Sequence, residues 1–221
     1  MNEVSANVER CLTAVTEIRC ATVCAHADAV GILSGTLSRA MGFESGHVAK
    51  LQFAARLHDI GKVTLSDKIL NKSGPLDATE WDAMREHPRL GFDILCRSDD
   101  SFVRTAALVA LCHHERWDGS GYPDGLAGEE IPPEARIVVV CDVYHALREA
   151  RPYKSPLGHE QALTIILDGD ESGRTRPSHF DPIVYAAFKT HSDLIRNAFE
   201  ESAAGDDGSQ GLRLETLRNL A

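Results

Sequence analysis

The chain has 221 residues, which suits one domain with a sizeable hydrophobic core. Its formal net charge of -10 at pH 7 argues against a nucleic-acid polymer as partner, because such binding needs a basic face. A small anionic ligand remains compatible with this charge, since metal ions and a few local cations can neutralise it. The longest strongly apolar run, residues 137–141, is far too short to cross a bilayer, and the N-terminus carries no signal segment. We therefore expect a cytoplasmic protein with no membrane span.

Six cysteines are scattered along the chain, and no two of them form a Cys-x-x-Cys pair. This spacing argues against a zinc ribbon and against a thioredoxin-like redox site. We expect reduced, partly buried thiols, as in a cytosolic protein. The six are Cys11, Cys20, Cys24, Cys96, Cys112 and Cys141.

Apolar residues recur at helical spacing along most of the chain and predict an all-α bundle of seven or more helices. The predicted helices span residues 4–19, 26–41, 48–60, 77–86, 88–95, 102–113, 158–167 and 182–199, with a loop over 63–75. Asp77 and Glu80 form a capping-box pattern, and Asp181 with Pro182 marks another helix start. Residues 137–140 have strand propensity, but no other segment offers a partner strand, so we expect a helix there too.

The two ends of the chain are predicted to lie outside the main domain. Residues 1–22 carry an amphipathic helix that packs on the core, continues a linker or mediates a homodimer. Residues 203–221 form a polar, flexible tail with a short helix near its end. The main domain is therefore expected over residues 23–202.

The pair His58-Asp59 stands at the end of an apolar-periodic segment, and Gly61 follows it closely. Neighbouring helix residues point about 100° apart, so both side chains serve one point only if the helix ends there. Alternatively, the Asp59 carboxylate reaches a second centre, because its two oxygens can bridge two metal ions. On its own, such a pair is more often a simple hydrogen bond at a helix end.

Further imidazole and carboxylate side chains change the interpretation of this pair. Together, these ligand types suit Zn, Mn or Fe, so we expect the fold to gather them at one metal centre. The candidates are His26, His87, His113, His114 and Asp142. We expect His47, His159 and His191 at the surface, and we expect His179 to help cap a helix.

The ordered motifs resemble an HD-GYP domain, the branch of the HD phosphohydrolase superfamily that acts on cyclic di-GMP. The string over residues 113–123, His-His-Glu-Arg-Trp-Asp-Gly-Ser-Gly-Tyr-Pro, makes the resemblance specific. It extends from about His26 to about Phe188 and implies an HD-GYP catalytic domain over residues 23–202. The other matching motifs are His58-Asp-Ile-Gly-Lys62, Ile69-Leu-Asn-Lys-Ser-Gly74, His87-Pro88, Ile131-Pro132, Ala135-Arg-Ile137, Asp142-Val-Tyr144, Arg151-Pro-Tyr-Lys154 and His179-Phe-Asp-Pro182.

The resemblance implies a helical bundle around a buried centre of two divalent metal ions, iron or manganese. By motif position the ligands form two sets, His26, His58, Asp59 and Asp142 for one metal, and Asp59, His87, His113 and His114 for the other. A hydroxide bridging the two metals would cleave cyclic di-GMP to linear pGpG, to GMP or to both. This chemistry belongs to bacterial second-messenger signalling.

Asp59 and Lys62 are the catalytic candidates. Lys62 lies one helical turn from His58 and could reach the phosphate or the leaving oxygen, whereas in an arbitrary chain it would be an ordinary solvated lysine. The resemblance implies substrate binding by Lys62, Gly121, Tyr122, Arg151 and Lys154.

Two positions depart from the family pattern. Thr22 stands where members with a third metal carry Glu, which favours a binuclear site. His145 stands where the family usually carries Asp, three residues after Asp142. We do not count His145 as a ligand, and we expect it to alter the second shell around Asp142 or the pocket wall.

Two other functions stay open. A catalytically weak module of this family could act as a cyclic di-GMP sensor, or as an adaptor that binds signalling proteins through the Gly-Tyr-Pro loop. The full ligand set argues against this, because burying so many polar groups without need is costly. A phosphohydrolase of another nucleotide is the remaining alternative, and the Gly-Tyr-Pro string argues against it.

Overall fold

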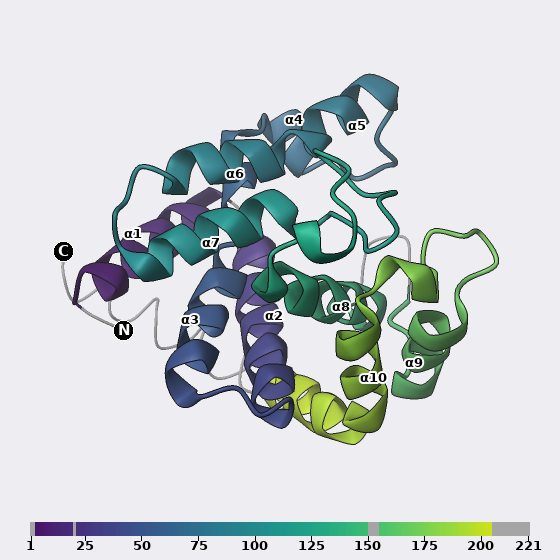
Figure 1. Cartoon of the computed structure of the whole chain (residues 1–221). Coiled ribbons are helices and arrows are strands. Elements are labelled where there is room, and N and C mark those ends of the chain that lie inside the picture. Colours follow the sequence, from purple (N-terminus) through teal and green to yellow (C-terminus); the bar gives the residue numbers. More distant parts are fainter. Residues whose placement is uncertain (1–2, 20, 150–154, 205–221) are drawn as a thin grey trace.

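The computed structural model describes residues 3–19, 21–149 and 155–204, and its regular elements there are all helical (Figure 1). The elements are α1 (Glu3–Arg19), α2 (Ala21–Ala40), α3 (Ser45–Arg56), η1 (Ile60–Thr64), α4 (Asp67–Leu70), α5 (Ala78–Arg85), α6 (His87–Leu95), α7 (Ser101–Cys112), η2 (Gly128–Glu130), α8 (Pro133–Arg148), α9 (His159–Asp168), η3 (Pro177–His179) and α10 (Pro182–Thr190), followed by a helical stretch over 192–204. In these ranges Asp118 and Ala127 form an isolated β-bridge, and no strand is present. The prediction of an all-α bundle of seven or more helices is confirmed.

Helices α2, α7 and α8 form the centre of the bundle, with α3 packed on both α2 and α7 (Figure 1). Their inward faces are apolar and buried, for example Leu33 in α2, Val109 in α7 and Ile137 in α8. Residues 137–140, the run with strand propensity, lie wholly within α8 and are all buried. Helix is favoured there because its own backbone bonds satisfy the buried peptide groups, without a neighbouring strand.

The predicted helix starts are confirmed by hydrogen bonds. The Glu80 amide donates to the Asp77 carboxylate at 3.0 Å, and the Asp77 amide donates to the Glu80 carboxylate at 2.8 Å. Asp181 accepts from the amides of Ile183 and Val184 at 2.7 and 3.3 Å, with Pro182 at the start of α10. These caps satisfy amides that would otherwise lack a partner in the first helical turn.

Other boundaries differ from the prediction. Helix α2 begins at Ala21, five residues before the predicted start at His26, and the predicted 63–75 loop contains the one-turn helix α4. The predicted 182–199 helix is interrupted at His191, between α10 and the 192–204 stretch. His159, expected at the surface, is buried and bonds through Nδ1 to the Tyr144 hydroxyl at 2.9 Å.

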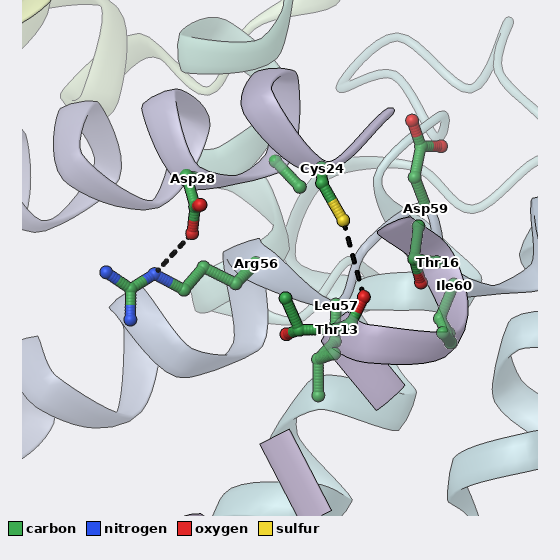
Figure 2. A pocket seen from close by; sticks show the side chains of 9 residues that line it. Thr13, Thr16, Cys24, Asp28, Arg56, Leu57, Asp59 and Ile60 are labelled. Atoms are coloured by element: carbon green, nitrogen blue, oxygen red, sulfur yellow. Dashed lines mark hydrogen bonds and ion pairs between the residues drawn. The ribbon is translucent and has the colours of Figure 1, made fainter. Parts of the chain in front are cut away.

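Helix α1 packs on the main body of the fold, as one of the three alternatives for the N-terminal segment predicted. Val8 and Leu12 contact the core, and Arg56 of α3 pairs with Glu9 of α1 at 2.9 Å. A narrow hollow lies between α1, α2 and the end of α3 (Figure 2). There the Cys24 thiol bonds to the Thr13 carbonyl at 3.5 Å. Its lining residues are Thr13, Thr16, Cys24, Ala27, Asp28, Arg56, Leu57, Asp59 and Ile60.

In the described part of the chain, no helix is long and apolar enough to cross a membrane. Residues 205–221, where a flexible tail with a short helix is predicted, lie outside the described residues. The division into segments 1–22, 23–202 and 203–221 stays a prediction.

Gly61 and Gly91 bring the backbone of η1 against the backbone of α6. A Cβ atom on Gly61 would lie 1.9 Å from the His87 carbonyl oxygen and 2.6 Å from the Gly91 amide nitrogen. Both obstacles are backbone atoms, so no side-chain rotation can relieve the clash. This close approach sets the separation between Asp59, which immediately precedes η1, and His87, the first residue of α6.

We predict that Gly61→Ala destabilises the fold by about 1–3 kcal/mol or more, because two backbones must move apart. Gly46→Ala is the matched control: nothing lies within 4 Å of a Cβ at Gly46 in α3. It should be neutral or stabilising by up to about 1 kcal/mol. Chemical denaturation of both variants measures the difference, and equal stabilities would contradict the proposed close contact.

Candidate metal centre

His58 and Asp59 lie just beyond the end of α3, where the chain leaves helical geometry. Leu57 has φ -107 and ψ 5, and Asp59 has φ -96 and ψ 8 before η1 begins at Ile60. Both side chains are buried. Both conditions considered for the pair are met, since the helix has ended and the two Asp59 oxygens face different groups of imidazoles.

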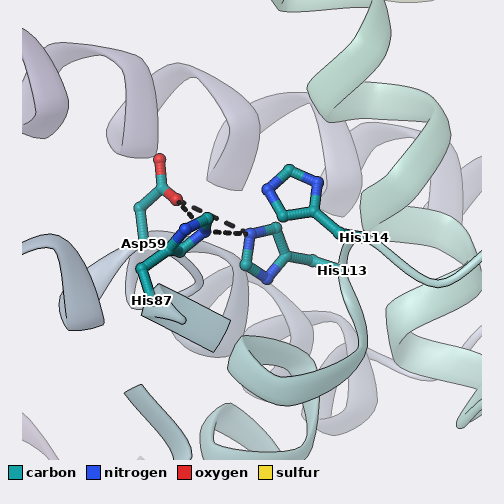
Figure 3. A group of neighbouring side chains, drawn as sticks. All are labelled: Asp59, His87, His113 and His114. Atoms are coloured by element: carbon teal, nitrogen blue, oxygen red, sulfur yellow. Dashed lines mark hydrogen bonds and ion pairs between the residues drawn. The ribbon is translucent and has the colours of Figure 1, made fainter. Parts of the chain in front are cut away.

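The Oδ1 atom of Asp59 faces one group of histidines (Figure 3). It lies 3.2 Å from His87 Nε2 and 3.6 Å from His113 Nε2, and these two nitrogens are 3.1 Å apart. His114 completes the group, with all four ligand atoms within 4.8 Å of one another. The elements that meet here are α6, the end of α7 and the segment after α3.

The Oδ2 atom of Asp59 faces a second group. It lies 3.4 Å from His58 Nε2, 4.0 Å from His26 Nε2 and 2.5 Å from Lys62 Nζ. Asp142 of α8 adds a carboxylate, with Oδ1 3.0 Å from His26 Nε2 and 4.0 Å from His58 Nε2. All seven predicted ligands therefore lie together, and Lys62 joins them through Asp59.

Backbone carbonyls orient three of the imidazoles. The Nδ1 atom of each ring lies within hydrogen-bond distance of the carbonyl three residues earlier, and each of these contacts lies near a helix end. The pairs are His58 with Ala55 at 2.6 Å, His87 with Met84 at 2.7 Å and His113 with Ala110 at 2.8 Å. If each Nδ1 donates its proton to that carbonyl, each Nε2 keeps its lone pair directed toward Asp59, as metal ligation requires.

Two buried polar atoms without hydrogen-bond partners indicate that these residues fit a metal centre. Two buried atoms, His58 Nε2 and Asp59 Oδ1, make no hydrogen bond. Leaving such an atom without a partner costs about 1–3 kcal/mol, and more for a charged group. A divalent cation would satisfy both atoms, and imidazole with carboxylate donors is a set that divalent transition metals prefer.

Burial and neighbouring charges keep most of these donors unprotonated near neutral pH. Burial lowers the pKa of His113 to about 4 and lowers that of His114 well below its usual value. Burial opposes ionisation of Asp59, yet Lys62 and His58 outweigh it and hold the Asp59 pKa well below 3.8. His58 differs: burial disfavours its charged form, but the carboxylates of Asp59 and Asp142 outweigh burial and raise its pKa above 6.5.

The Gly-Tyr-Pro loop folds back onto the metal centre. The Tyr122 ring stacks on His114, with centroids 4.7 Å apart, and the Tyr122 amide donates to the His114 carbonyl at 3.1 Å. A Cβ on Gly121 would lie 2.4 Å from the Arg116 amide nitrogen, so glycine is required for this close approach. Tyr122 therefore lies beside His114, and Gly121 lets the loop backbone approach residues 114–116; substrate binding by both residues stays a prediction.

Glu115 holds the Gly-Tyr-Pro loop, a role that was not predicted from the sequence. Its buried carboxylate accepts three loop amides, from Asp124 at 2.7 Å and from Gly125 and Leu126 at 3.1 Å each. It thus holds the loop that carries Tyr122. Its place directly after His114 was a signal that could have suggested this role.

Arg136 joins Trp117, in the 113–123 segment, to Asp181 at the start of α10. Its guanidinium lies 5.3 Å from the Trp117 ring centroid and bonds to Asp181 at 3.1 Å. His179 contributes by accepting through Nδ1 from the Arg176 amide at 3.3 Å at the start of η3, while Asp181 caps α10. The motif predicts that His179 helps to cap the helix that begins at Pro182; this prediction is wrong, because Asp181 caps α10 and the His179 contact lies within η3.

His145 contacts His26 directly, with the two Nδ1 atoms 2.8 Å apart. His145 thus lies against the imidazole that pairs with Asp142, and its predicted effect on the surroundings of Asp142 or on the pocket wall stays a prediction. Arg151 and Lys154, predicted to bind substrate, lie outside the described residues, as does the side chain of Thr22.

A protein-family model described as HD domain matches residues 10–182. The chain belongs to the HD domain family. It is similar to the cyclic di-GMP phosphodiesterase response regulator RpfG of Xanthomonas campestris pv. campestris (strain 8004), with 41% identity over 169 residues, 75% of this chain and 45% of that protein. It is also similar to 3'3'-cGAMP-specific phosphodiesterase 2 of Vibrio cholerae serotype O1 (strain ATCC 39315 / El Tor Inaba N16961), with 36% identity over 193 residues, 87% of this chain and 36% of that protein.

A solved structure has a similar fold. The HDG"Y"P protein Bd1817 from Bdellovibrio bacteriovorus superposes with a TM-score of 0.59 and 18% sequence identity, covering 80% of this chain and 52% of that one. The resemblance to HD-GYP proteins is thereby confirmed. This HD domain chain spans less than half the length of the two curated relatives described above.

We predict that metal binding releases a proton near pH 6.5, because the raised pKa of His58 keeps a proton where a ligand lone pair is needed. In metal-free protein this imidazolium stabilises the fold below pH 6.5, and the contribution is lost as pH rises through the raised pKa. Metal affinity should therefore fall as pH decreases through that pKa. Calorimetry in two buffers of different ionisation enthalpy measures the release, and identical heats would contradict it.

Proposed function

We propose that this HD domain is a metal-dependent phosphodiesterase that hydrolyses cyclic di-GMP to linear pGpG, to GMP or to both. The observation that carries the proposal is the Asp59 carboxylate, whose two oxygens face separate groups of imidazoles. The names of several relatives, including the Xanthomonas regulator, support cyclic di-GMP as the substrate.

Two divalent ions, iron or manganese, would occupy these two groups. One would be held by His26, His58, Asp59 and Asp142, and the other by Asp59, His87, His113 and His114. The presence of Thr22 where trinuclear members carry Glu favours two ions over three.

When bound, two such ions lower the pKa of a water molecule and neutralise charge on the phosphate. The residues of the chain then have positioning and electrostatic roles. Asp59 holds both halves of the centre at a fixed separation. Lys62, already 2.5 Å from Asp59, places an ammonium where it can stabilise developing negative charge on the phosphate or on the leaving oxygen.

Substrate binding is assigned to the loop side of the centre. Tyr122 offers an aromatic face beside His114, and the Arg85 guanidinium lies 5.1 Å from its ring centroid. An aromatic surface with a nearby cation suits a guanine base and an anionic backbone. Arg151 and Lys154 are proposed, from their motif positions alone, to bind the phosphates. A homodimer, and partner proteins bound through the Gly-Tyr-Pro loop, also stay predictions.

A second candidate substrate is 3'3'-cGAMP, because the Vibrio relative is named for that specificity and matches 87% of this chain. It differs from the first candidate in one base only. The metal centre is therefore compatible with both, and selectivity depends on the residues that contact the bases.

We predict that purified protein loaded with Mn or Fe hydrolyses cyclic di-GMP faster than 3'3'-cGAMP, and that Asp59→Ala abolishes turnover. Asp93→Ala, which removes an exposed carboxylate on α6, is the control and should keep full activity. Chromatography of the products measures both substrates. Faster turnover of 3'3'-cGAMP would favour the second candidate, and tight binding without turnover would leave a sensor or adaptor.

We predict that Lys62→Ala lowers kcat by about 10²-fold, the usual cost of one electrostatic donor in a transition state, with metal content retained. Lys68→Ala, on the exposed face of α4, is the matched control. Steady-state kinetics with parallel metal analysis separates the two effects. An unchanged kcat for Lys62→Ala would contradict a catalytic role.

A further inference from the structure

His26 is held differently from the other oriented histidines of the centre. His58, His87 and His113 lie near helix ends, where the carbonyl three residues earlier lies within hydrogen-bond distance of each Nδ1 atom. His26 lies inside the twenty-residue helix α2, where backbone carbonyls already accept from amides four residues later. Its Nδ1 therefore needs a partner from elsewhere, and the partner is His145 at 2.8 Å.

One face of α8 contacts both nitrogens of the His26 ring. Asp142 Oδ1 lies 3.0 Å from Nε2, and His145 Nδ1 lies 2.8 Å from Nδ1. Asp142 and His145 are three residues apart and so project from the same side of the helix. The His26 Nε2 atom also faces Asp59 and the proposed metal position. Only Nδ1 is therefore available for a hydrogen bond that fixes the orientation of the His26 ring.

The proton between the two rings has a defined place once His26 ligates a metal. The lone pair of His26 Nε2 would then point to the ion, so the proton of its neutral ring sits on Nδ1. That proton is donated to His145 Nδ1, which must present a lone pair. His145 is therefore neutral, with its own proton on Nε2.

We infer that His145 is a positioning residue that fixes the tautomer and orientation of His26, and that as a neutral acceptor it leaves the ion on the His26 side more weakly held than an aspartate would. This inference rests on the proposed metal centre. A carboxylate acceptor would raise the basicity of the His26 ring, and a neutral imidazole does so less.

The surroundings of His145 support an orienting role. Its ring is buried and packs against Phe199 of the 192–204 stretch, with centroids 5.5 Å apart. The His26 and His145 rings meet edge-on, with centroids 4.7 Å apart and planes at 68°. This packing restricts rotation of His145, so its lone pair stays aimed at His26.

A third metal held by His145 itself is the competing interpretation. Ligand atoms of His26, His145 and Glu149 lie within 4.8 Å of one another. However, two nitrogens each about 2.1 Å from one ion lie roughly 3 Å or more apart in ordinary coordination geometries. The observed Nδ1 to Nδ1 distance of 2.8 Å fits a hydrogen bond better.

The test is a Mn²⁺ titration of the metal-free chain, with bound ions counted by elemental analysis after equilibrium dialysis and without substrate. The unmodified chain should bind two ions. His26→Ala and His87→Ala identify which binding step belongs to which side. His145→Ala should weaken the His26-side ion by about 10–100-fold and leave the other unchanged.

Two further variants keep the test informative if the alanine variant folds poorly. His145→Asn keeps an acceptor and should restore affinity to within a few-fold of the unmodified chain, and His145→Asp should exceed it. His159→Ala, which removes a buried histidine bonded to Tyr144, should leave both ions unaffected.

Equal weakening of both ions by His145→Ala, or no change at either, would overturn the role of His145 while leaving the metal centre intact. Loss of a third ion with two retained would overturn it as well, because His145 would then be a ligand. An unmodified chain that binds no ion would overturn the proposed function and this inference together.

Discussion

The candidate metal centre is arranged around one buried carboxylate, that of Asp59. Each of its oxygens faces imidazole nitrogens on a different side, and Oδ1 has no hydrogen-bond donor of its own. An ionised carboxylate removed from water costs several kcal/mol unless cations compensate for it. In this structure Lys62 supplies one positive charge to Oδ2, and the remaining electrostatic demand matches divalent ions.

The architecture around Asp59 follows from where helices end. His58, His87 and His113 lie near helix ends, and in each case a backbone carbonyl three residues earlier orients the ring through Nδ1. The glycine contact between η1 and α6 sets the distance from Asp59 to His87. His26 lies in the interior of α2, and its ring contacts side chains of α8 instead. Rigid helices thus position ligands that are 116 positions apart in sequence, from His26 to Asp142.

Much of this could be predicted from the sequence, because its signals are local or carried by motifs. The helical spacing and the Asp77 and Asp181 caps each follow from a few neighbouring residues. Gly61 also indicated a helix end in this region, but the predicted 48–60 helix runs four residues past the observed end of α3 at Arg56. The gathering of the ligands follows from the resemblance to HD-GYP proteins rather than from periodicity. Pairings between distant segments have no such signal. No local pattern places His145 against His26, 119 positions away, and none shows that His159 meets Tyr144 in the core.

The loop over residues 113–123 could be predicted from the sequence only in part. Glycine, proline and tyrosine in the 113–123 string indicated a loop close to the ligand, but not how it is held. Three amides directed at the Glu115 carboxylate supply that restraint, and sequence periodicity cannot reveal a bond within an irregular loop. The stacking of Tyr122 on His114 joins this loop to the cluster of candidate metal ligands.

The most direct test of the central claim is anomalous diffraction from crystals of this chain grown with manganese. Two peaks are expected, one beside each oxygen of Asp59, the first among His87, His113 and His114 and the second among His26, His58 and Asp142. A single ion, or ions that leave Asp59 without a metal contact, would contradict the account.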